Sequence, residues 1–190
     1  MLKVLSLSGL LLFAWVVIAM AAVPDPSKCT VPPRAPACLL GDIAYTVTVR
    51  DASNNPIQGA VVVADLTSAL LSSGPNLSPA TVCLYLCSGQ TLTPSAVTNA
   101  SGQAAFYLKT GDCCPGNYPV WVGSVNLGSI LILNSIDVNG DGALSGADVT
   151  AFAGYYFANN GCADVNGDGA ISGADATQFA THYFGNHLCP

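Results

Sequence analysis

The sequence predicts a mainly β fold with a small α part, an antiparallel β-sandwich followed by a module of two short helices. Short apolar and β-branched runs, separated by Gly, Pro, Asn or Ser, recur through residues 40–133. About seven short strands at such a spacing favour a two-sheet sandwich. Residues 134–190 instead contain one stretch written twice, and each copy ends in a short helical pattern.

Residues 1–22 are typical of a secretory signal peptide. Lys3 precedes an apolar run from Val4 to Ile18, and small residues suited to cleavage follow it. The run is short for a membrane span, which needs about 20 residues, and no later segment is long and apolar enough. We therefore expect a mature chain without a membrane span that is secreted, extracellular or bound at the cell surface.

Residues 23–39 contain five prolines. This composition favours an extended N-terminal arm or linker. The two cysteines of this segment, Cys29 and Cys38, are expected either to close a small loop or to staple the arm to the next domain.

The predicted sandwich, residues 40–133, begins with a clear alternation. Over residues 43–49, apolar side chains at every odd position alternate with small or polar ones, which indicates a half-buried strand. A turn signal at residues 54–56 leads to a second predicted strand at residues 59–64. Further strands are predicted at residues 81–86, 104–108, 118–125 and 129–133.

Three segments of this region, residues 47–51, 55–62 and 98–106, resemble the immunoglobulin-like, transthyretin-like modules of carboxypeptidase regulatory domains and bacterial surface proteins. The resemblance covers about 80 residues and implies an Ig-like β-sandwich. It implies little about function, because such sandwiches host many unrelated roles.

Charged residues make up only 8% of the chain, against about 25% in a typical soluble domain. There is no Glu, and after signal-peptide removal four basic and eleven acidic residues give a net charge of −7. Without a basic patch we expect no nucleic-acid partner. The Asp residues outside the repeats form no recognisable pair, so the sequence predicts a non-catalytic protein rather than an enzyme.

Eight cysteines remain in the mature chain, and an even number in an exported protein favours disulfides. Cys162 precedes the second copy of the repeat and Cys189 follows its helix. We expect these two residues to pair and to clasp that helix.

Two further pairs of cysteines lie in the sandwich region. Cys83 and Cys87, four residues apart, would point to the same face of a strand. The adjacent Cys113 and Cys114 lie in a predicted turn. A cross-link between the two pairs is expected, and a vicinal redox disulfide between Cys113 and Cys114 is the alternative.

The doubled stretch carries the predicted metal sites. Residues 137–148 return 27 residues later as 164–175, and 17 of 24 positions are identical between 137–160 and 164–187. Oxygen donors at loop positions 1, 3, 5, 9 and 12, a backbone carbonyl at position 7 and Gly at position 6 follow the ligand spacing of a calcium loop. The predicted ligands of two Ca²⁺ ions are Asp137, Asn139, Asp141, Ala143, Ser145, Asp148, Asp164, Asn166, Asp168, Ala170, Ser172 and Asp175.

Two calcium ions would bring the net charge of the mature chain to −3. The competing interpretation, a pair of Asn/Asp-Gly turns, does not explain why position 12 is acidic in both copies. That residue is Asp148 or Asp175, where the EF-hand pattern has Glu.

Each loop is followed by a predicted helix, residues 148–158 and 175–185, and none precedes the first loop. This order resembles the dockerin type I module over residues 135–189. The resemblance implies a dockerin-like domain at residues 134–190, one Ca²⁺ site per repeat and a cohesin-like protein receptor as partner.

Aromatic residues recur on one face of the two predicted helices. We expect the helices to pack against each other through this face, with some of its residues left exposed for a partner. The recurring residues are Phe152, Tyr155 and Tyr156, matched by Phe179, His182 and Tyr183, and they are followed by Phe157 and Phe184.

A zinc site is a weaker alternative in the same region. His182, His187, Cys162 and Cys189 are ligand types for Zn²⁺, but their spacing is irregular. Disulfides are the expected state of these cysteines.

The sequence leaves two functions open. In the first, a secreted, non-catalytic calcium-binding protein uses a dockerin-like tail for extracellular association or attachment. In the second, the protein is a structural subunit that self-assembles into a surface layer, fibre or tube stabilised by calcium and disulfides. Abundant small residues and the low charge favour the second more than they would for an ordinary dockerin.

Overall fold

The structure is a computed structural model that describes residues 22–38, 41–69, 85–87 and 89–185. The predicted signal peptide lies outside the described residues except for its last position. The strands are β1 (Arg34–Ala37), β2 (Ala44–Thr48), β3 (Val61–Ala64), β4 (Tyr85–Leu86), β5 (Ser95–Val97), β6 (Gln103–Tyr107), β7 (Thr110–Gly111), β8 (Cys114–Val122) and β9 (Val125–Ser135). The helices are α1 (Gly146–Phe157) and α2 (Gly173–Phe184), with short 3₁₀ turns at Thr67–Ala69 and Gly161–Ala163.

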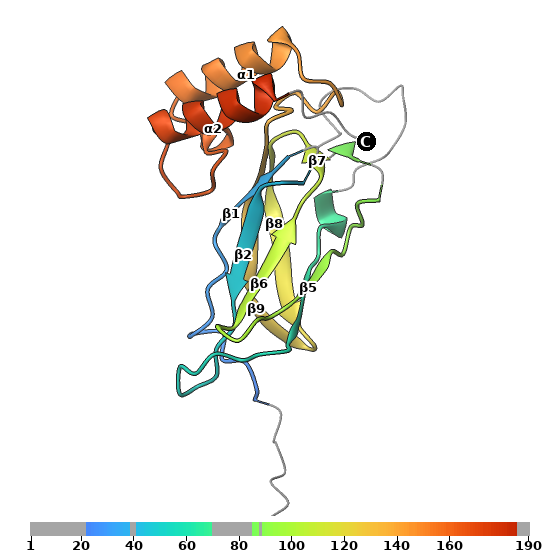
Figure 1. Ribbon diagram of the computed structural model, residues 1–190, viewed down its shortest axis with the longest axis vertical. Helices are drawn as coiled ribbons and strands as arrows, with labels where there is room; N and C mark the ends of the chain where they lie inside the picture. Colours follow the sequence, from blue (N-terminus) through green and yellow to red (C-terminus); the bar gives the residue numbers. More distant parts are fainter. Residues whose placement is uncertain (1–21, 39–40, 70–84, 88, 186–190) are drawn as a thin grey trace, which may run out of the picture.

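The main sheet has five strands in the order β1-β9-β8-β3-β5, and two-stranded sheets β2-β6 and β4-β7 accompany it. Figure 1 shows the β2-β6 pair lying over the β8-β9 hairpin, with both helices at one end of an elongated β body. The alternation predicted at residues 43–49 is confirmed, since Tyr45, Val47 and Val49 are buried. They join one core with side chains from both sheets, including Phe106 of β6 and Ile130 of β9.

The predicted fold class, an antiparallel Ig-like β-sandwich followed by a two-helix dockerin-like module, is wrong. β1 pairs with β9 in parallel, Arg34 opposite Ile132 and Ala37 opposite Ser135, so the main sheet is mixed. The proline content of this segment predicted an arm, yet β1 lies at the sheet edge, where a proline's missing N–H is tolerated. Ala35 and Ala37 are small enough to be buried in the core.

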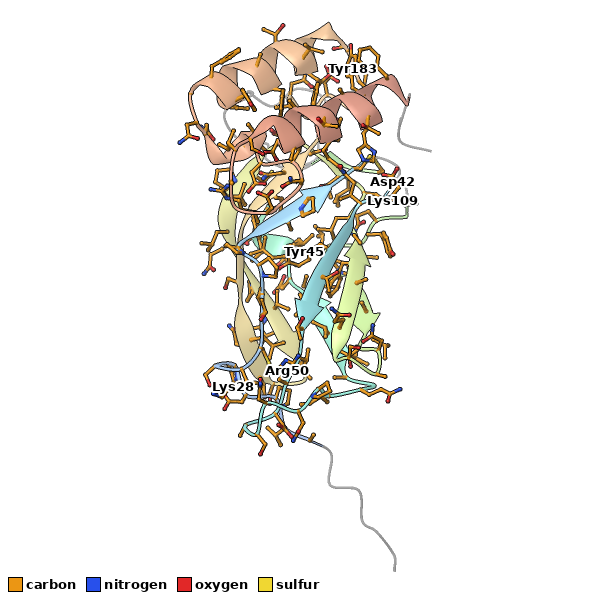
Figure 2. The ribbon with its side chains drawn as sticks, turned by 60° about the vertical axis from the view of Figure 1, so that its left-hand side comes forward. Lys28, Asp42, Tyr45, Arg50, Lys109 and Tyr183 are labelled. Carbon is orange, nitrogen blue, oxygen red and sulfur yellow. A yellow bond between two sulfur atoms is a disulfide. The ribbon has the colours of Figure 1, made fainter. Side chains whose placement is uncertain are left out.

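Tyr45 fixes the N-terminal segment over the core. Its ring is buried between the sheets and its hydroxyl donates to the carbonyl of Pro32 at 2.8 Å. Burial raises the pKa of this phenol above its ordinary value, so the hydroxyl remains a hydrogen-bond donor even in alkaline solution. Figure 2 places Tyr45 near the middle of the β body, with Lys28 and Arg50 at the end far from the helices.

The β8-β9 hairpin leads directly into the first repeat. A two-residue turn joins the strands after the Val122–Val125 pair, and Gly123 has a φ of 56°, a left-handed conformation typical of tight hairpin turns. β9 then runs through Ser135, two residues before Asp137. The prediction that a strand, rather than a helix, leads into the first loop is confirmed.

α1 and α2 each begin two residues earlier than predicted. Their apolar faces share a second core with Ile136, Val138 and Val165 from the loops and with Cys38 and Ile43 from the β body. The helices therefore pack on the end of the sheets as well as on each other. No helix in the described part of the chain is long and apolar enough to cross a membrane.

Candidate metal centre

The first loop is organised around the buried carboxylate of Asp137. Its Oδ1 accepts a hydrogen bond from the backbone N–H of Asp141 at 3.2 Å, and its Oδ2 accepts one from Gly142 at 2.9 Å. Gly142 has a φ of 82°, a conformation that glycine adopts without strain. The sharp turn at position 6 thus folds the loop around the side chain at position 1.

Asp148 closes the loop at its other end. Its Oδ2 accepts from the backbone N–H of Ser145 at 2.8 Å, which completes a capping box at the start of α1. Its Oδ1 accepts from Asn139 N at 3.2 Å, a bond across the loop that the capping box does not require. Helix capping therefore also favours an acidic residue at position 12, an explanation that the sequence interpretation lacked.

The second loop repeats this network bond for bond. Asp164 accepts from Asp168 N at 3.1 Å and from Gly169 N at 2.9 Å. Asp175 accepts from Asn166 N at 3.3 Å and from Ser172 N at 2.8 Å. Each length lies within about 0.1 Å of its counterpart in the first loop, so the duplicated sequence folds as a duplicated structure.

The remaining predicted ligands lie in the same two loops. In the first loop, Asn139 Nδ2 donates to Asp141 Oδ2 at 2.9 Å and Ala143 N donates to Asp141 Oδ1 at 2.9 Å. Ser145 Oγ accepts from Ala147 N at 3.2 Å as the helix N-cap. The equivalent bonds of the second loop involve Asn166, Asp168, Ala170 and Ser172.

The donor set of the first loop fits a hard divalent cation. Carboxylate oxygens of Asp137, Asp141 and Asp148 lie within 4.8 Å of one another. Asp137 and Asp148 are fully buried, and burial is the main cause that raises the pKa of Asp137 to about 7. Buried carboxylates are costly without a cation, and an all-oxygen set is the one that Ca²⁺ prefers.

The second loop differs in having a protein cation beside its position-1 carboxylate. Arg34 Nη1 lies 2.6 Å from Asp164 Oδ2, and the Asp164 side chain is fully buried. Among the described residues, Asp137 has no such ion pair. The two loops therefore share a fold but differ in charge.

Both loops are attached to the β body. Asp112 N donates to the carbonyl of Asp137 at 2.6 Å. Asn134 Nδ2 donates to the carbonyl of Asp164, the first residue of the second loop, and to that of Gly161. A Cβ added at Gly140 would lie 2.7 Å from Asp112 Cβ. Burial also raises the pKa of Asp112 to about 6. Sequence reasoning assigned no role to Arg34, Asp112 or Asn134, because each contacts a residue at least 25 positions away along the chain.

The disulfide prediction for Cys162 is wrong. Cys162 bonds to Cys113, 49 residues away, and so ties the start of the second repeat to the base of β8. This bond also excludes the vicinal Cys113–Cys114 disulfide. Cys87 is disulfide-bonded as well, whereas Cys83 and Cys189 lie outside the described residues.

The aromatic faces of the helices are partly buried and partly exposed. Phe152 and Phe179, equivalent positions of the two repeats, stack with ring centroids 4.3 Å apart and planes at 10°. Equivalent residues of the two repeats therefore contact each other directly. Phe157 and Phe184 are also equivalent, yet they are 85% and 83% exposed.

Comparisons of the chain with models of known protein families, with curated proteins and with solved structures find no match. The resemblance to dockerin modules therefore remains a prediction from the residues of the repeat.

Proposed function

We propose that this is an exported, non-catalytic calcium-binding protein whose two loop–helix repeats mediate extracellular protein–protein association. The observation that carries the proposal is the repeated hydrogen-bond network that gathers buried carboxylates in each loop. Asp137, Asp148, Asp164 and Asp175 are all fully buried.

The calcium part of the proposal is supported by charge and geometry together. Buried carboxylates repel one another unless they are protonated or a cation lies between them. In each loop the position-1 and position-12 carboxylates accept backbone N–H bonds that fix their orientation. Binding Ca²⁺ would replace that repulsion by coordination and would order both loops together with the helices that follow them.

The association part of the proposal is supported by the two exposed phenylalanines. A largely exposed aromatic ring is unfavourable in water, and both repeats place one at the same position. The rings of Phe157 and Phe184 each make an edge-on contact with the preceding tyrosine, at 5.7 and 5.3 Å between centroids. They are thus partly oriented for contact with another protein. A dockerin-like role would make that protein a cohesin-like receptor.

Self-assembly into a layer, fibre or tube is the second candidate. Val61 of β3 and Val97 of β5 lie opposite each other and are 51% and 61% exposed. β5 is the edge of the main sheet and has only three residues. Among the described residues no strand pairs with the outer side of β5, and an exposed apolar pair beside such an edge favours edge-to-edge contact between copies.

Calorimetry on the purified mature protein tests the calcium proposal. We expect two Ca²⁺ per chain, and one per chain in Asp137→Ala and in Asp164→Ala. Asp65→Ala is the matched control, because Asp65 lies in the β body and accepts from Thr67. Absence of calcium uptake by the unmodified protein, or binding of two Ca²⁺ by the Asp137→Ala/Asp164→Ala double variant, would overturn the proposal.

Light scattering with calcium and with chelator separates the two modes of association. A monomer that binds an immobilised cohesin domain only with calcium supports attachment. Calcium-dependent homopolymers that Val97→Lys prevents support self-assembly instead. A monomer that binds no protein partner in calcium would contradict both.

A further inference from the structure

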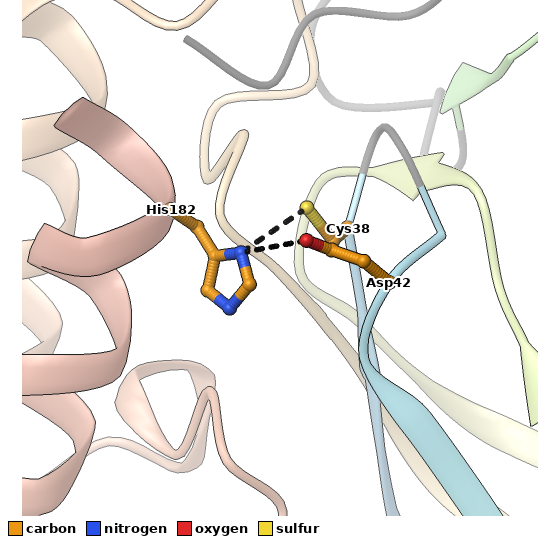
Figure 3. Close-up of side chains that lie close together, drawn as sticks. All are labelled: Cys38, Asp42 and His182. Atoms are coloured by element: carbon orange, nitrogen blue, oxygen red, sulfur yellow. Dashed lines mark hydrogen bonds and ion pairs between the residues drawn. The ribbon is translucent and has the colours of Figure 1, made fainter. Parts of the chain in front are cut away.

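A second cluster of ligand-type side chains lies between the β body and α2. Cys38 directly follows β1, Asp42 lies two residues before β2, and His182 comes from the last turn of α2 (Figure 3). Cys38 Sγ lies 3.9 Å from His182 Nδ1, and Asp42 Oδ2 lies 3.4 Å from the same nitrogen. The three donor atoms all lie within 4.8 Å of one another.

The nitrogen–oxygen distance fits an edge of a tetrahedral site, and the sulfur–nitrogen distance of 3.9 Å is about 0.3 Å longer than such an edge. With Zn–S of about 2.3 Å and Zn–N and Zn–O of about 2.0–2.1 Å, tetrahedral angles place sulfur roughly 3.6 Å from nitrogen, and nitrogen roughly 3.3 Å from oxygen. A charge-assisted N–H···O bond would be shorter, at about 2.7–2.9 Å. The observed separation of 3.4 Å between Asp42 Oδ2 and His182 Nδ1 is therefore closer to that of two ligands of one ion.

The surroundings of the cluster orient its members. Gly41 N donates to the carbonyl of Cys38 at 2.8 Å, which brings the residue before Asp42 close to Cys38. The side-chain amide of Gln178 lies 2.9 Å from His182 Nε2. The amide group of Gln178 can be rotated by 180°, which exchanges its oxygen and its nitrogen. With the oxygen next to Nε2, Gln178 accepts the Nε2 proton, and the lone pair of Nδ1 then faces Cys38 and Asp42.

The internal repeat supplies a comparison within the chain. In the first repeat, the positions equivalent to Gln178 and His182 are Ala151 and Tyr155. The first repeat therefore has neither the imidazole nor the amide that orients it. His182 and Gln178, the residue that orients it, are thus among the seven positions that differ between the copies. α2 therefore has a histidine facing the β body where α1 has Tyr155 at the equivalent position.

A thiol–imidazole catalytic site accounts less well for this arrangement. In such a site the nucleophile and the orienting group contact opposite ring nitrogens. Here Cys38 and Asp42 both approach Nδ1, and Cys38 is fully buried. Convergence of sulfur, nitrogen and oxygen on one point is instead the geometry of metal coordination.

We propose that Cys38, Asp42 and His182 form a Zn²⁺ site that is separate from the two calcium loops. Thiolate and imidazole favour zinc over calcium, and three protein ligands leave a fourth position for water. The Asp42 side chain is 40% exposed, which provides access from solvent. Because its ligands come from the β body and from α2, the bound ion fixes that helix to the sheets.

Binding of Zn²⁺ and Co²⁺ to the untagged mature protein, with both calcium loops saturated, tests this site. We expect one equivalent of Zn²⁺ and, with Co²⁺, a near-ultraviolet thiolate-to-cobalt charge-transfer band. Cys38→Ser abolishes the band. His182→Tyr, which restores the residue of the first repeat, weakens zinc binding at least tenfold.

Cys29→Ser is the matched control, because Cys29 lies near Arg50 rather than near α2; it leaves zinc binding and the cobalt band unchanged. Zinc uptake that persists in the Cys38→Ser/His182→Tyr double variant would overturn the proposal. So would peptide mapping of the exported protein that finds Cys38 in a disulfide. Neither result bears on calcium uptake, which is measured before zinc is added.

Discussion

At the scale of single residues, Arg34 is the main source of difference between the two loops. It belongs to β1, 130 residues from its partner, and its guanidinium pairs with the fully buried carboxylate of Asp164. Removing one partner of a buried pair leaves an uncompensated charge. The same pair places a positive charge beside a predicted calcium ligand. Arg34 should therefore stabilise the second loop most when calcium is absent.

We expect Arg34→Met to lower the free energy of unfolding of the calcium-free protein by about 2–3 kcal/mol, because Asp164 loses its counter-charge. Calcium should restore most of this loss, since the ion takes over that role. Urea unfolding with calcium and with chelator measures both values. Arg50→Met is the control, because Arg50 makes an exposed hydrogen bond to the carbonyl of Asn54. Equal losses with and without calcium would contradict this explanation.

At the scale of elements, the loops depend on close contacts with the β body. Gly140 has a φ of 68° and faces the Cβ of Asp112. Gly167 has a φ of 73° and faces Pro36, where an added Cβ would lie 2.8 Å from Cδ. Position 4 of each loop thus requires glycine for two reasons: its φ is positive, and a neighbouring side chain leaves no room for a Cβ atom.

Gly140→Ala should reduce the free energy of unfolding by at least about 1 kcal/mol, because an alanine is strained at positive φ and would contact Asp112. Gly146→Ala is the matched control: Gly146 begins α1, and no heavy atom lies within 4 Å of an added Cβ. Alanine in the helix should be neutral or slightly stabilising. Denaturant unfolding of the two variants in chelator measures the difference. Equal midpoints would contradict the proposed role of Gly140.

The Cys113–Cys162 disulfide is the covalent link between β8 and the second repeat. The disulfide closes a loop with a sequence separation of 49 residues. In the chain-entropy model, the entropy that the unfolded chain loses contributes about 4 kcal/mol to the free energy of unfolding. We expect the Cys113→Ala/Cys162→Ala variant to lose roughly 2–4 kcal/mol of stability. Calcium affinity should fall more at the second loop than at the first, because Cys162 lies two residues before Asp164. Thermal unfolding and calorimetry test these expectations, and unchanged stability would contradict them.

At the scale of the whole molecule, the exposed phenylalanines are the proposed means of association. Phe157→Ser and Phe184→Ser should leave stability within about 0.5 kcal/mol, because exposed side chains contribute little to the core. We expect the double variant to lose at least tenfold in calcium-dependent association, measured by light scattering or receptor capture. Tyr107→Ser, which changes an exposed residue of β6, is the control. Undiminished association in the double variant would exclude this surface.

Local patterns predicted much of the molecule correctly. The alternation at residues 43–49 located β2, and the doubled Asp/Asn/Gly pattern located two loops with matching hydrogen bonds. These features depend on neighbours within about twelve residues, so the sequence states them directly. The parallel β1-β9 pair was missed because strand partners are selected by packing across nearly 100 residues, and the proline-rich composition of β1 favoured an arm.

The sequence by itself determined the loop repeat, its donor types and the short helix that follows each copy, because ligand spacing and helix capping are local properties. Only the tertiary structure decided that Cys162 bonds to Cys113, that Arg34 pairs with Asp164 and that Cys38, Asp42 and His182 converge. Those contacts join segments separated by up to 144 residues. They arise because packing the helices on the end of the sheets brings those segments together, and no local pattern records that packing.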